Sequence, residues 1–199
     1  MRKFAARLGR LGADEWPHEA AILELCCGRG NGLRALHQLG FRDLEGVDLS
    51  PALVARYDGP ARVQVGDCRS LPCTDASKDV VIVQGGLHHL LELPRDLELT
   101  LCEARRVLRP GGRFVAVEPW LTPFLRCVHA VSEVALARKL SRRLDAFATM
   151  VEHERRTYEQ WLGAPAVIVA LLEREFEPRI SRRRSGKLEF VGVARRLGR

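Results

Sequence analysis

The sequence predicts an α/β fold: one domain over residues 1–199, built on a doubly wound, mainly parallel, Rossmann-like sheet of seven strands. Short apolar runs alternate with helical patterns through the first 120 residues, which is typical of strands and helices in βαβ order. A glycine-rich turn follows the first apolar run, and an alternating pattern near the C-terminus predicts an antiparallel hairpin. A chain of 199 residues is an ordinary size for one such domain.

The strands and helices of the first 120 residues follow in regular order. Strands are predicted near residues 21–25, 44–48, 62–65, 80–84 and 113–118, and helices near residues 30–39, 51–56 and 95–108. The run Arg109-Pro110-Gly111-Gly112 ends the last of these helices, because proline cannot continue it and glycine permits a turn. The basic N-terminal segment lacks an apolar run long enough for a secretory signal, so we expect an ordinary helix there.

The pattern changes after Pro119, where no strand signal follows for about 55 residues. Residues 122–148 are amphipathic and rich in arginine, and they predict a long helix within a helical cap inserted at about 120–153. Residues 155–175 end in an apolar run and predict the helix that packs on the sheet before the hairpin.

The C-terminal hairpin is predicted to have strands at 178–181 and 187–194 and a turn at 182–186. Residues 178–199 hold eight Lys or Arg against one acid, which accounts for the whole net charge of +7. Such a cluster can contact nucleic acid or anionic lipid. Charge also protects an exposed sheet edge against pairing with another strand, and we favour this second interpretation.

Composition gives further expectations. No run of eighteen apolar residues is present, so we expect no membrane span. The basic face of 122–148 could lie on an anionic membrane surface, but a solvated face of a lid helix is the simpler interpretation. The six cysteines form no C-x-x-C pair; we expect reduced thiols, no metal site and a cytoplasmic location.

Residues 22–32, ILELCCGRGNG, predict a buried strand that enters a glycine turn and then a helix. Glycines let a ligand approach the backbone, and the free amides at the start of the helix point to the same place, which suits a nucleotide-like cofactor. The third glycine, Gly32, comes one residue too early for the dinucleotide motif. Glu24, four residues before Gly28, favours a cationic cofactor over a pyrophosphate because a carboxylate would repel phosphate.

Two more acids follow predicted strands. Asp48 ends the strand at 44–48 and is well placed to hold two ribose hydroxyls. Asp67 follows the strand at 62–65, and its carboxylate could accept a hydrogen bond from an adenine amine.

Five ordered segments resemble one family: ILELCCGRGNG, GVDLS, VQVGDCRSLP, DVVIVQGGLHHL and VLRPGGRFVAVEP. The chain resembles the class I S-adenosylmethionine-dependent methyltransferases, and within them the type 11 or ubiquinone-biosynthesis-like small-molecule group. The resemblance implies S-adenosylmethionine as cofactor and, in the family, a helical insertion that closes over the substrate. The implied cofactor contacts are Glu24, Cys26, Gly28, Gly30, Asp48, Leu49, Asp67, Cys68 and Gln84. The family usually has glycine where this chain has Cys26. The pocket could accommodate a small thiol, or the thiol could narrow it near the methionine tail of the cofactor.

The family places residues that follow the fourth strand near the transferred methyl group. His88 and His89 stand there, and either could remove a proton from an acceptor hydroxyl; the other interpretation is a hydrogen bond to the loop backbone. Glu118 ends the strand at 113–118 at the same rim of the sheet. It could bind an acceptor amine or hydroxyl, or cap the adjacent loop.

Methyl transfer to an oxygen, nitrogen or carbon of a small molecule is therefore the leading function. An RNA methyltransferase that uses the basic hairpin is an alternative. Enzymes that methylate base amines carry an Asp/Asn-Pro-Pro-aromatic loop after the fourth strand, and Gln84-Gly85-Gly86-Leu87 does not match it. A non-catalytic binding protein is a third hypothesis, indicated only by Cys26. The glycine spacing and Glu24 disfavour an NAD-dependent reductase.

Overall fold

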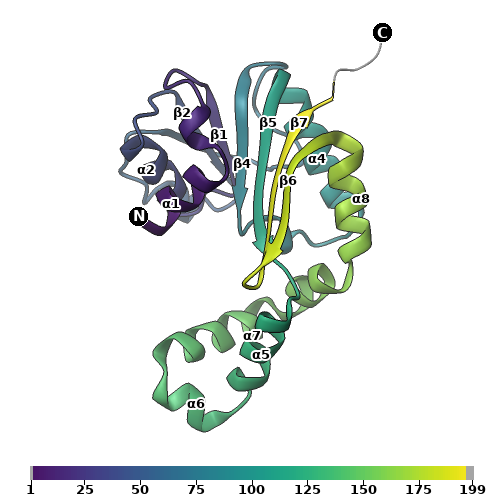
Figure 1. Ribbon diagram of the computed structural model, residues 1–199. Coiled ribbons are helices and arrows are strands. Elements are labelled where there is room, and N and C mark those ends of the chain that lie inside the picture. Colours follow the sequence, from purple (N-terminus) through teal and green to yellow (C-terminus); the bar gives the residue numbers. More distant parts are fainter. Residues whose placement is uncertain (1, 196–199) are drawn as a thin grey trace.

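The computed structural model describes residues 2–195, which form a twisted sheet between two layers of helices, with a helical arm extending from one end (Figure 1). Two arginines of the predicted basic tail, Arg196 and Arg199, lie outside the described residues. The strands are β1 Ile22–Leu25, β2 Leu44–Asp48, β3 Arg62–Val65, β4 Lys78–Gln84, β5 Leu108–Pro119, β6 Phe176–Arg184 and β7 Lys187–Ala194. The α-helices are α1 Arg2–Arg10, α2 Asn31–Gln38, α3 Pro51–Val54, α4 Arg95–Val107, α5 Pro123–Ser132, α6 Ala135–Leu140, α7 Arg142–Gly163 and α8 Pro165–Glu175.

The seven strands lie in the order β3-β2-β1-β4-β5-β7-β6. Strands β1 to β5 are parallel, whereas β7 runs antiparallel to both β5 and β6. The predicted fold class is thus confirmed. The strand order reverses between β1 and β4, and in such sheets a ligand binds in the crevice beyond the carboxyl ends of the strands at this point.

Two apolar cores hold the helices on the sheet, because successive side chains of a buried strand point to opposite faces. On one face, α4 and α8 cover residues such as Leu23 and Phe114, and the Phe114 ring stacks on Phe176 at 4.6 Å between ring centres. On the other face, α1 and α2 cover residues such as Ile22 and Val80. Both cores anchor β1 and β4, so the strand ends that form the crevice are rigid.

The prediction of one helix over 122–148 is wrong, because the segment contains α5, α6 and the first turns of α7. The side chain of Thr122 caps the start of α5 by accepting from the Leu125 amide, and Ser141 caps α7 in the same way. Helix α7 also continues to Gly163, beyond the predicted end of the cap at 153. The helix that packs on the sheet is α8 alone, which begins at Pro165, a residue suited to the first helical turn.

Two other boundaries differ from the predictions. Strand β5 begins at Leu108, so the Pro110-Gly111-Gly112 segment belongs to its first residues, beside a register shift against β4. The hairpin turn contains only Ser185 and Gly186, both with positive φ. The arginines predicted at the tip therefore lie on β6, along the edge of the sheet. Within residues 2–195, no helix has the length and apolar character needed to cross a bilayer.

Candidate functional site

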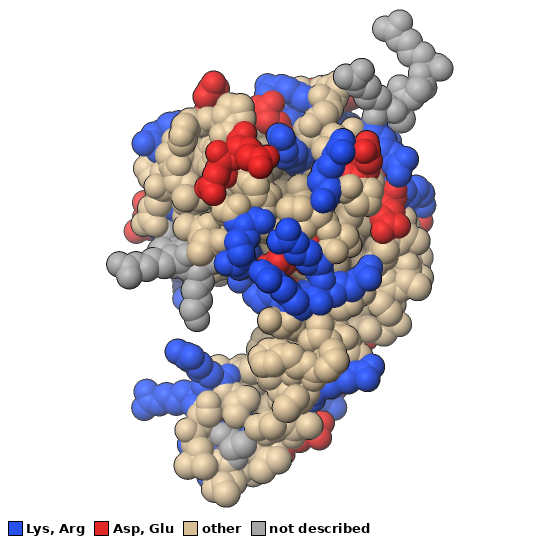
Figure 2. Space-filling model, viewed as in Figure 1, with Lys and Arg blue, Asp and Glu red and all other residues tan. Residues whose placement is uncertain are grey.

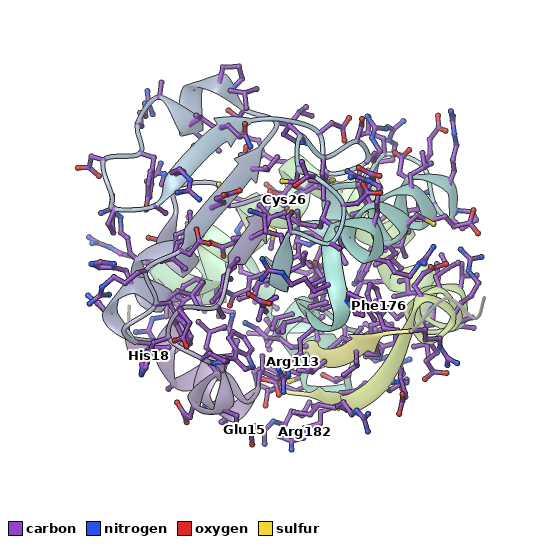
Figure 3. The ribbon with its side chains drawn as sticks, turned by 90° about the horizontal axis from the view of Figure 1, so that it is seen from above. Glu15, His18, Cys26, Arg113, Phe176 and Arg182 are labelled. Carbon is purple, nitrogen blue, oxygen red and sulfur yellow. The ribbon has the colours of Figure 1, made fainter. Side chains whose placement is uncertain are left out.

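A cavity of about 550 Å³ opens at the carboxyl ends of the parallel strands, at the point where the strand order reverses. Six of the nine predicted cofactor contacts line it: Cys26, Gly28, Asp48, Leu49, Asp67 and Cys68. They come from the loops after β1, β2 and β3, which approach one another only because those strands are neighbours. In the view from above, Cys26 lies over the centre of the molecule, away from Phe176 and Arg182 of the hairpin (Figure 3).

Asp48 holds the glycine turn against the end of β2. Its Oδ2 accepts a hydrogen bond from the Gly28 amide at 2.7 Å, and its Oδ1 accepts one from the Ser50 amide at 2.9 Å. Gly28 has a φ of +52°, and a Cβ atom at this position would meet no atom within 4 Å, so it would point into the cavity. The backbone therefore forms an open cradle beside a carboxylate, which is the arrangement that a ribose with adjacent hydroxyls requires.

Asp67 does not stand alone in the cavity, because Arg69 binds both of its carboxylate oxygens and also donates to Asp96 at 3.0 Å. The hydrogen bonds from Arg69 lower the pKa of Asp67, so this carboxylate stays ionised at neutral pH. Arg69 and Asp96 line the same cavity, and the sequence analysis missed both. Their separation of 27 residues gives no local signal that they meet.

Cys26 and Cys68 meet inside the cavity. Cys26 has a φ of +50°, a conformation that strains a residue with a side chain, in agreement with the glycine that the family usually has there. The neighbouring Cys68 thiol and burial raise the pKa of Cys26, and Cys68 Sγ also lies 3.6 Å from the hydroxyl of Thr100. The side chain of Cys26 stands against Gly86 in the cavity wall, and a narrowing of the pocket by this thiol stays a prediction.

Glu24 lies under the cavity and does not line it. It is buried against α2, and a Cβ atom on Gly32 would overlap its carboxylate, which explains the early third glycine. Burial raises the pKa of Glu24 to about 7, and the side chain of Gln84 donates to it at 3.4 Å. With a pKa of about 7, Glu24 is only partly ionised at neutral pH and offers a cationic cofactor less attraction than a fully ionised carboxylate would. Gly30 also lies outside the cavity wall and packs on the ring of Tyr57.

A second cavity, of about 560 Å³, lies between the end of the sheet and the cap. Helices α1, α5 and α7 and the turn between β6 and β7 supply its walls, and Gly85, at the end of β4, lines both cavities. Gln84, predicted as a cofactor contact, lines this second cavity. The apolar walls come from residues that sequence reasoning did not connect, such as Phe124, Phe147 and Met150.

The three predicted catalytic residues lie where the two cavities meet. His89 lines the first cavity, and His88 and Glu118 line the second. Glu118 Oε1 accepts from the amides of Gly86 and Leu87 at 2.9 and 3.0 Å, and its Oε2 lies 2.8 Å from His88 Nδ1. A carboxylate oxygen accepts hydrogen bonds, so the contact with Glu118 assigns a ring proton to Nδ1 of His88, and in this tautomer Nε2 carries a lone pair.

Glu154 on α7 completes this group and was not predicted. Its carboxylate lies 3.7 Å from His88 Nε2 and 3.8 Å from His89 Nδ1. Burial lowers the pKa of His89, and the neighbouring His88 ring lowers it further because two protonated rings would repel each other. A proton that arrives on His88 Nε2 would therefore face a carboxylate on each side of the ring. The ligand atoms of His88, His89 and Glu154 lie within 4.8 Å of one another, so this group could also hold a cation.

Comparison with known proteins identifies the family. A family model described as a methyltransferase domain matches residues 23–116. A ubiquinone/menaquinone biosynthesis C-methyltransferase from Rubrivivax gelatinosus is 32% identical over 158 residues, which cover 75% of this chain. The chain belongs to the class I S-adenosylmethionine-dependent methyltransferases, type 11 group. The resemblance inferred from the five ordered segments is thus confirmed, and the cofactor of this family is S-adenosylmethionine.

Solved structures agree on the methyltransferase fold. The PH0226 protein from Pyrococcus horikoshii matches with a TM-score of 0.71 over 98% of this chain and 91% of that one, at 19% identity. A 1,6-didemethyltoxoflavin-N1-methyltransferase from Burkholderia thailandensis, solved with its substrate and S-adenosylhomocysteine, matches with a TM-score of 0.60 over 97% of this chain and 77% of that one, at 21% identity. This chain spans 61% of the length of the Rubrivivax relative.

Proposed function

We propose that this chain is an enzyme that transfers a methyl group from S-adenosylmethionine to an oxygen, nitrogen or carbon of a small molecule held in the cavity under the cap. The observation that carries the proposal is the meeting of the two cavities at Gly85, beside His88 and His89. One cavity is built from the motifs of the family, and the other is built by the cap. In this proposal the cap and the sheet form one domain.

The residues of the first cavity fit the cofactor. Asp48 would bind the ribose hydroxyls, Gly28 would leave room for the chain of the cofactor, and Asp67 would accept from the adenine amine while Arg69 fixes its orientation. When bound, the cofactor supplies an electrophilic methyl group on its sulfonium. The protein then has to align the acceptor atom with that group and exclude water, because positioning supplies most of the rate enhancement.

His88 is proposed as the base for an acceptor that loses a proton. Glu118 fixes the ring by its bond to Nδ1, which leaves Nε2 free to accept the acceptor proton. Glu154 then stabilises the imidazolium from the other side. Glu118 is a positioning residue in this scheme, since both of its oxygens are already bound to the protein.

RNA is the alternative acceptor, and the arginines of β6 are the observation behind it. Several of them already have partners: Arg179 pairs with Glu177 at 3.2 Å, Arg184 approaches Glu189 at 3.8 Å, and Arg183 lies over the Trp120 ring at 5.5 Å. These contacts support the interpretation of a charged, protected sheet edge.

Transfer of tritium from S-[methyl-³H]adenosylmethionine tests the proposal directly. The protein is incubated with the low-molecular-mass fraction of a cell extract and, separately, with total RNA. We expect label in the small-molecule fraction, and its loss when the Asp48→Ala variant replaces the protein. Label found only in RNA, with a rate that falls as salt rises, would contradict the proposal and support the alternative.

A further inference from the structure

We propose that the cavity under the cap takes an apolar acceptor that carries an anionic group, such as a carboxylate, phosphate or sulfonate. This inference rests on the proposed function, because it names the class of acceptor for that site. It starts from the charges that line the cavity. Three cationic side chains reach it from three separate elements: Arg7 from α1, Arg143 from α7 and Lys187 from β7.

The carboxylate in the cavity wall does not neutralise Arg7 or Arg143. Glu118 is the acidic residue in the lining, and both of its oxygens are bound to His88 and to the amides of the adjacent loop. Within the described part of the cavity wall, Arg7 and Arg143 therefore have no carboxylate that balances their charge.

Arg7 lies deeper in this cavity wall than the exposed Arg143. It is half-buried, and its Nη1 donates to the neutral side-chain amide of Gln84 at 3.2 Å. Burial lowers the pKa of Arg7, and the nearby charge of Glu189 only partly opposes this effect. The Glu189 carboxylate lies 4.0 Å from Arg10 and 3.8 Å from Arg184, so it is shared among several arginines. A half-buried guanidinium without a carboxylate in contact favours an anionic ligand.

Arg143 stands at the mouth of the cavity. It is exposed, and among residues 2–195 the structure records no hydrogen bond or ion pair for it. Figure 2 shows Lys and Arg side chains on both the end of the sheet and the cap, on either side of the hollow between them. An anion that enters this hollow would meet positive charge from both walls.

Most of the remaining lining is apolar or aromatic, with Phe4, Val117, Phe124, Leu125, Val128 and Phe147 among its residues. Phe124 is 59% exposed, which is unusual for a phenylalanine and is explained if a ligand covers it. An apolar body with one charged group matches both parts of this surface, because the body would cover the aromatic side chains and the anion would contact the arginines.

Two fluorescent probes with the same ring system test the charge preference. The anionic probe is 1-anilinonaphthalene-8-sulfonate, and the neutral one is N-phenyl-1-naphthylamine, which lacks only the sulfonate. We expect the anionic probe to bind at least about tenfold more tightly, since one charge-assisted hydrogen bond contributes roughly that factor. Equal affinity for the two probes would overturn the inference.

Matched variants then locate the anion. Arg7→Gln and Arg143→Gln are each expected to weaken the sulfonate probe about tenfold and to leave the neutral probe unchanged. Arg142→Gln is the control, because Arg142 is the exposed neighbour of Arg143 and does not line the cavity. An equal loss in the Arg142 variant would overturn the inference, since it would indicate attraction to the general surface charge. Val128→Trp should displace both probes, and retention of both would place them outside the cavity.

A parallel titration with S-adenosylhomocysteine separates this inference from the proposed function. If the protein binds S-adenosylhomocysteine and the probes show no charge preference, the inference fails and the proposed function stands. If the probes follow the expected pattern and S-adenosylhomocysteine does not bind, the cavity takes anions and the proposed function fails. Aryl carboxylates and aryl phosphates, used as competitors of the sulfonate probe, then distinguish the kinds of anion.

Discussion

The two cavities of this protein are of nearly equal size but are built in opposite ways. The cofactor cavity consists largely of backbone and short side chains at the ends of neighbouring strands, with Gly28 and Asp48 as its centre. The cavity under the cap consists of long side chains from α1, α5, α7 and the hairpin, which are far apart in the sequence. The comparison teaches that a strand-end site is fixed by local motifs, whereas a cap site is fixed by packing between distant elements.

The largest expected effect is a loss of affinity in the cofactor cavity that leaves the cavity under the cap unchanged. Asp48→Ala should weaken binding of S-adenosylmethionine about a thousandfold, because it removes two charge-assisted hydrogen bonds to the ribose and releases the Gly28 amide. Calorimetric titration measures this change. Asp75→Ala is the control, since Asp75 is exposed and lies outside the cavity. Both variants should bind the probe under the cap as tightly as the wild type does. If Asp48→Ala also bound the cofactor as tightly as the wild type, the assignment of Asp48 to the ribose would be refuted.

The next prediction concerns stability, and it comes from Glu24 under the cofactor cavity. Its pKa is raised to about 7 in the folded protein, so folding favours the protonated form. The resulting stability is fully present below the pKa of the unfolded state and is lost as pH rises from about 4.5 through about 7. Glu24→Gln should therefore raise the free energy of unfolding above pH 8 by up to about 3 kcal/mol and change it little at pH 4.

Urea denaturation of both proteins across this pH range measures the effect. The difference between wild type and variant should grow as pH rises. A constant difference would show that Glu24 does not titrate in the folded protein within this range, and the proposed protonation of Glu24 would be wrong.

A change at the junction of the cavities should affect turnover and leave cofactor binding intact. Replacing His88 and His89 together with Gln should lower kcat about a hundredfold for an acceptor that loses a proton, which is the usual contribution of a general base. His153→Gln serves as control, because His153 is exposed on α7 and its Nδ1 bonds to the Thr149 carbonyl of the same helix. Unchanged kcat at several pH values in the double variant would exclude both histidines as the base.

The smallest effect is expected inside the cap. Tyr158 is 2% exposed, and its hydroxyl lies 3.2 Å from His129 Nε2, so this contact joins α7 to α5. Tyr158→Phe should remove about 1 kcal/mol of stability, the usual contribution of one hydrogen bond, and leave cofactor affinity unchanged. Thermal denaturation with and without S-adenosylhomocysteine checks both parts. A loss of cofactor affinity would show that the two regions are coupled.

The sequence predicted the parallel strands well, because β1 and β4 are short apolar runs and a turn follows each of them. It also placed Gly28, Asp48 and Asp67 correctly at one rim, since the carboxyl ends of parallel strands share an edge. It could not show that Glu24 faces α2, because the close approach to Gly32 depends on how the helix packs on the strand.

The cap was harder to predict. The break between α5 and α6 falls at Glu133 and Val134, with neither proline nor glycine to mark it. Glu154 contacts His88 and His89, which precede it by more than 60 residues in the sequence. Arg7, near the start of the chain, lines the cavity under the cap together with residues of α5 and α7. Such contacts depend on tertiary packing, and no local pattern reports them.

A thermal-shift titration with S-adenosylmethionine, S-adenosylhomocysteine and NAD(H) in parallel tests the central claim most directly. A ligand at 100 times its dissociation constant adds about 2.7 kcal/mol of stability, which for a chain of this length is a shift of about 5 to 10 °C. We predict this shift with the two adenosyl-sulfur compounds and none with NAD(H). No shift with either adenosyl compound, or a shift with NAD(H) alone, would contradict the account of the cofactor cavity.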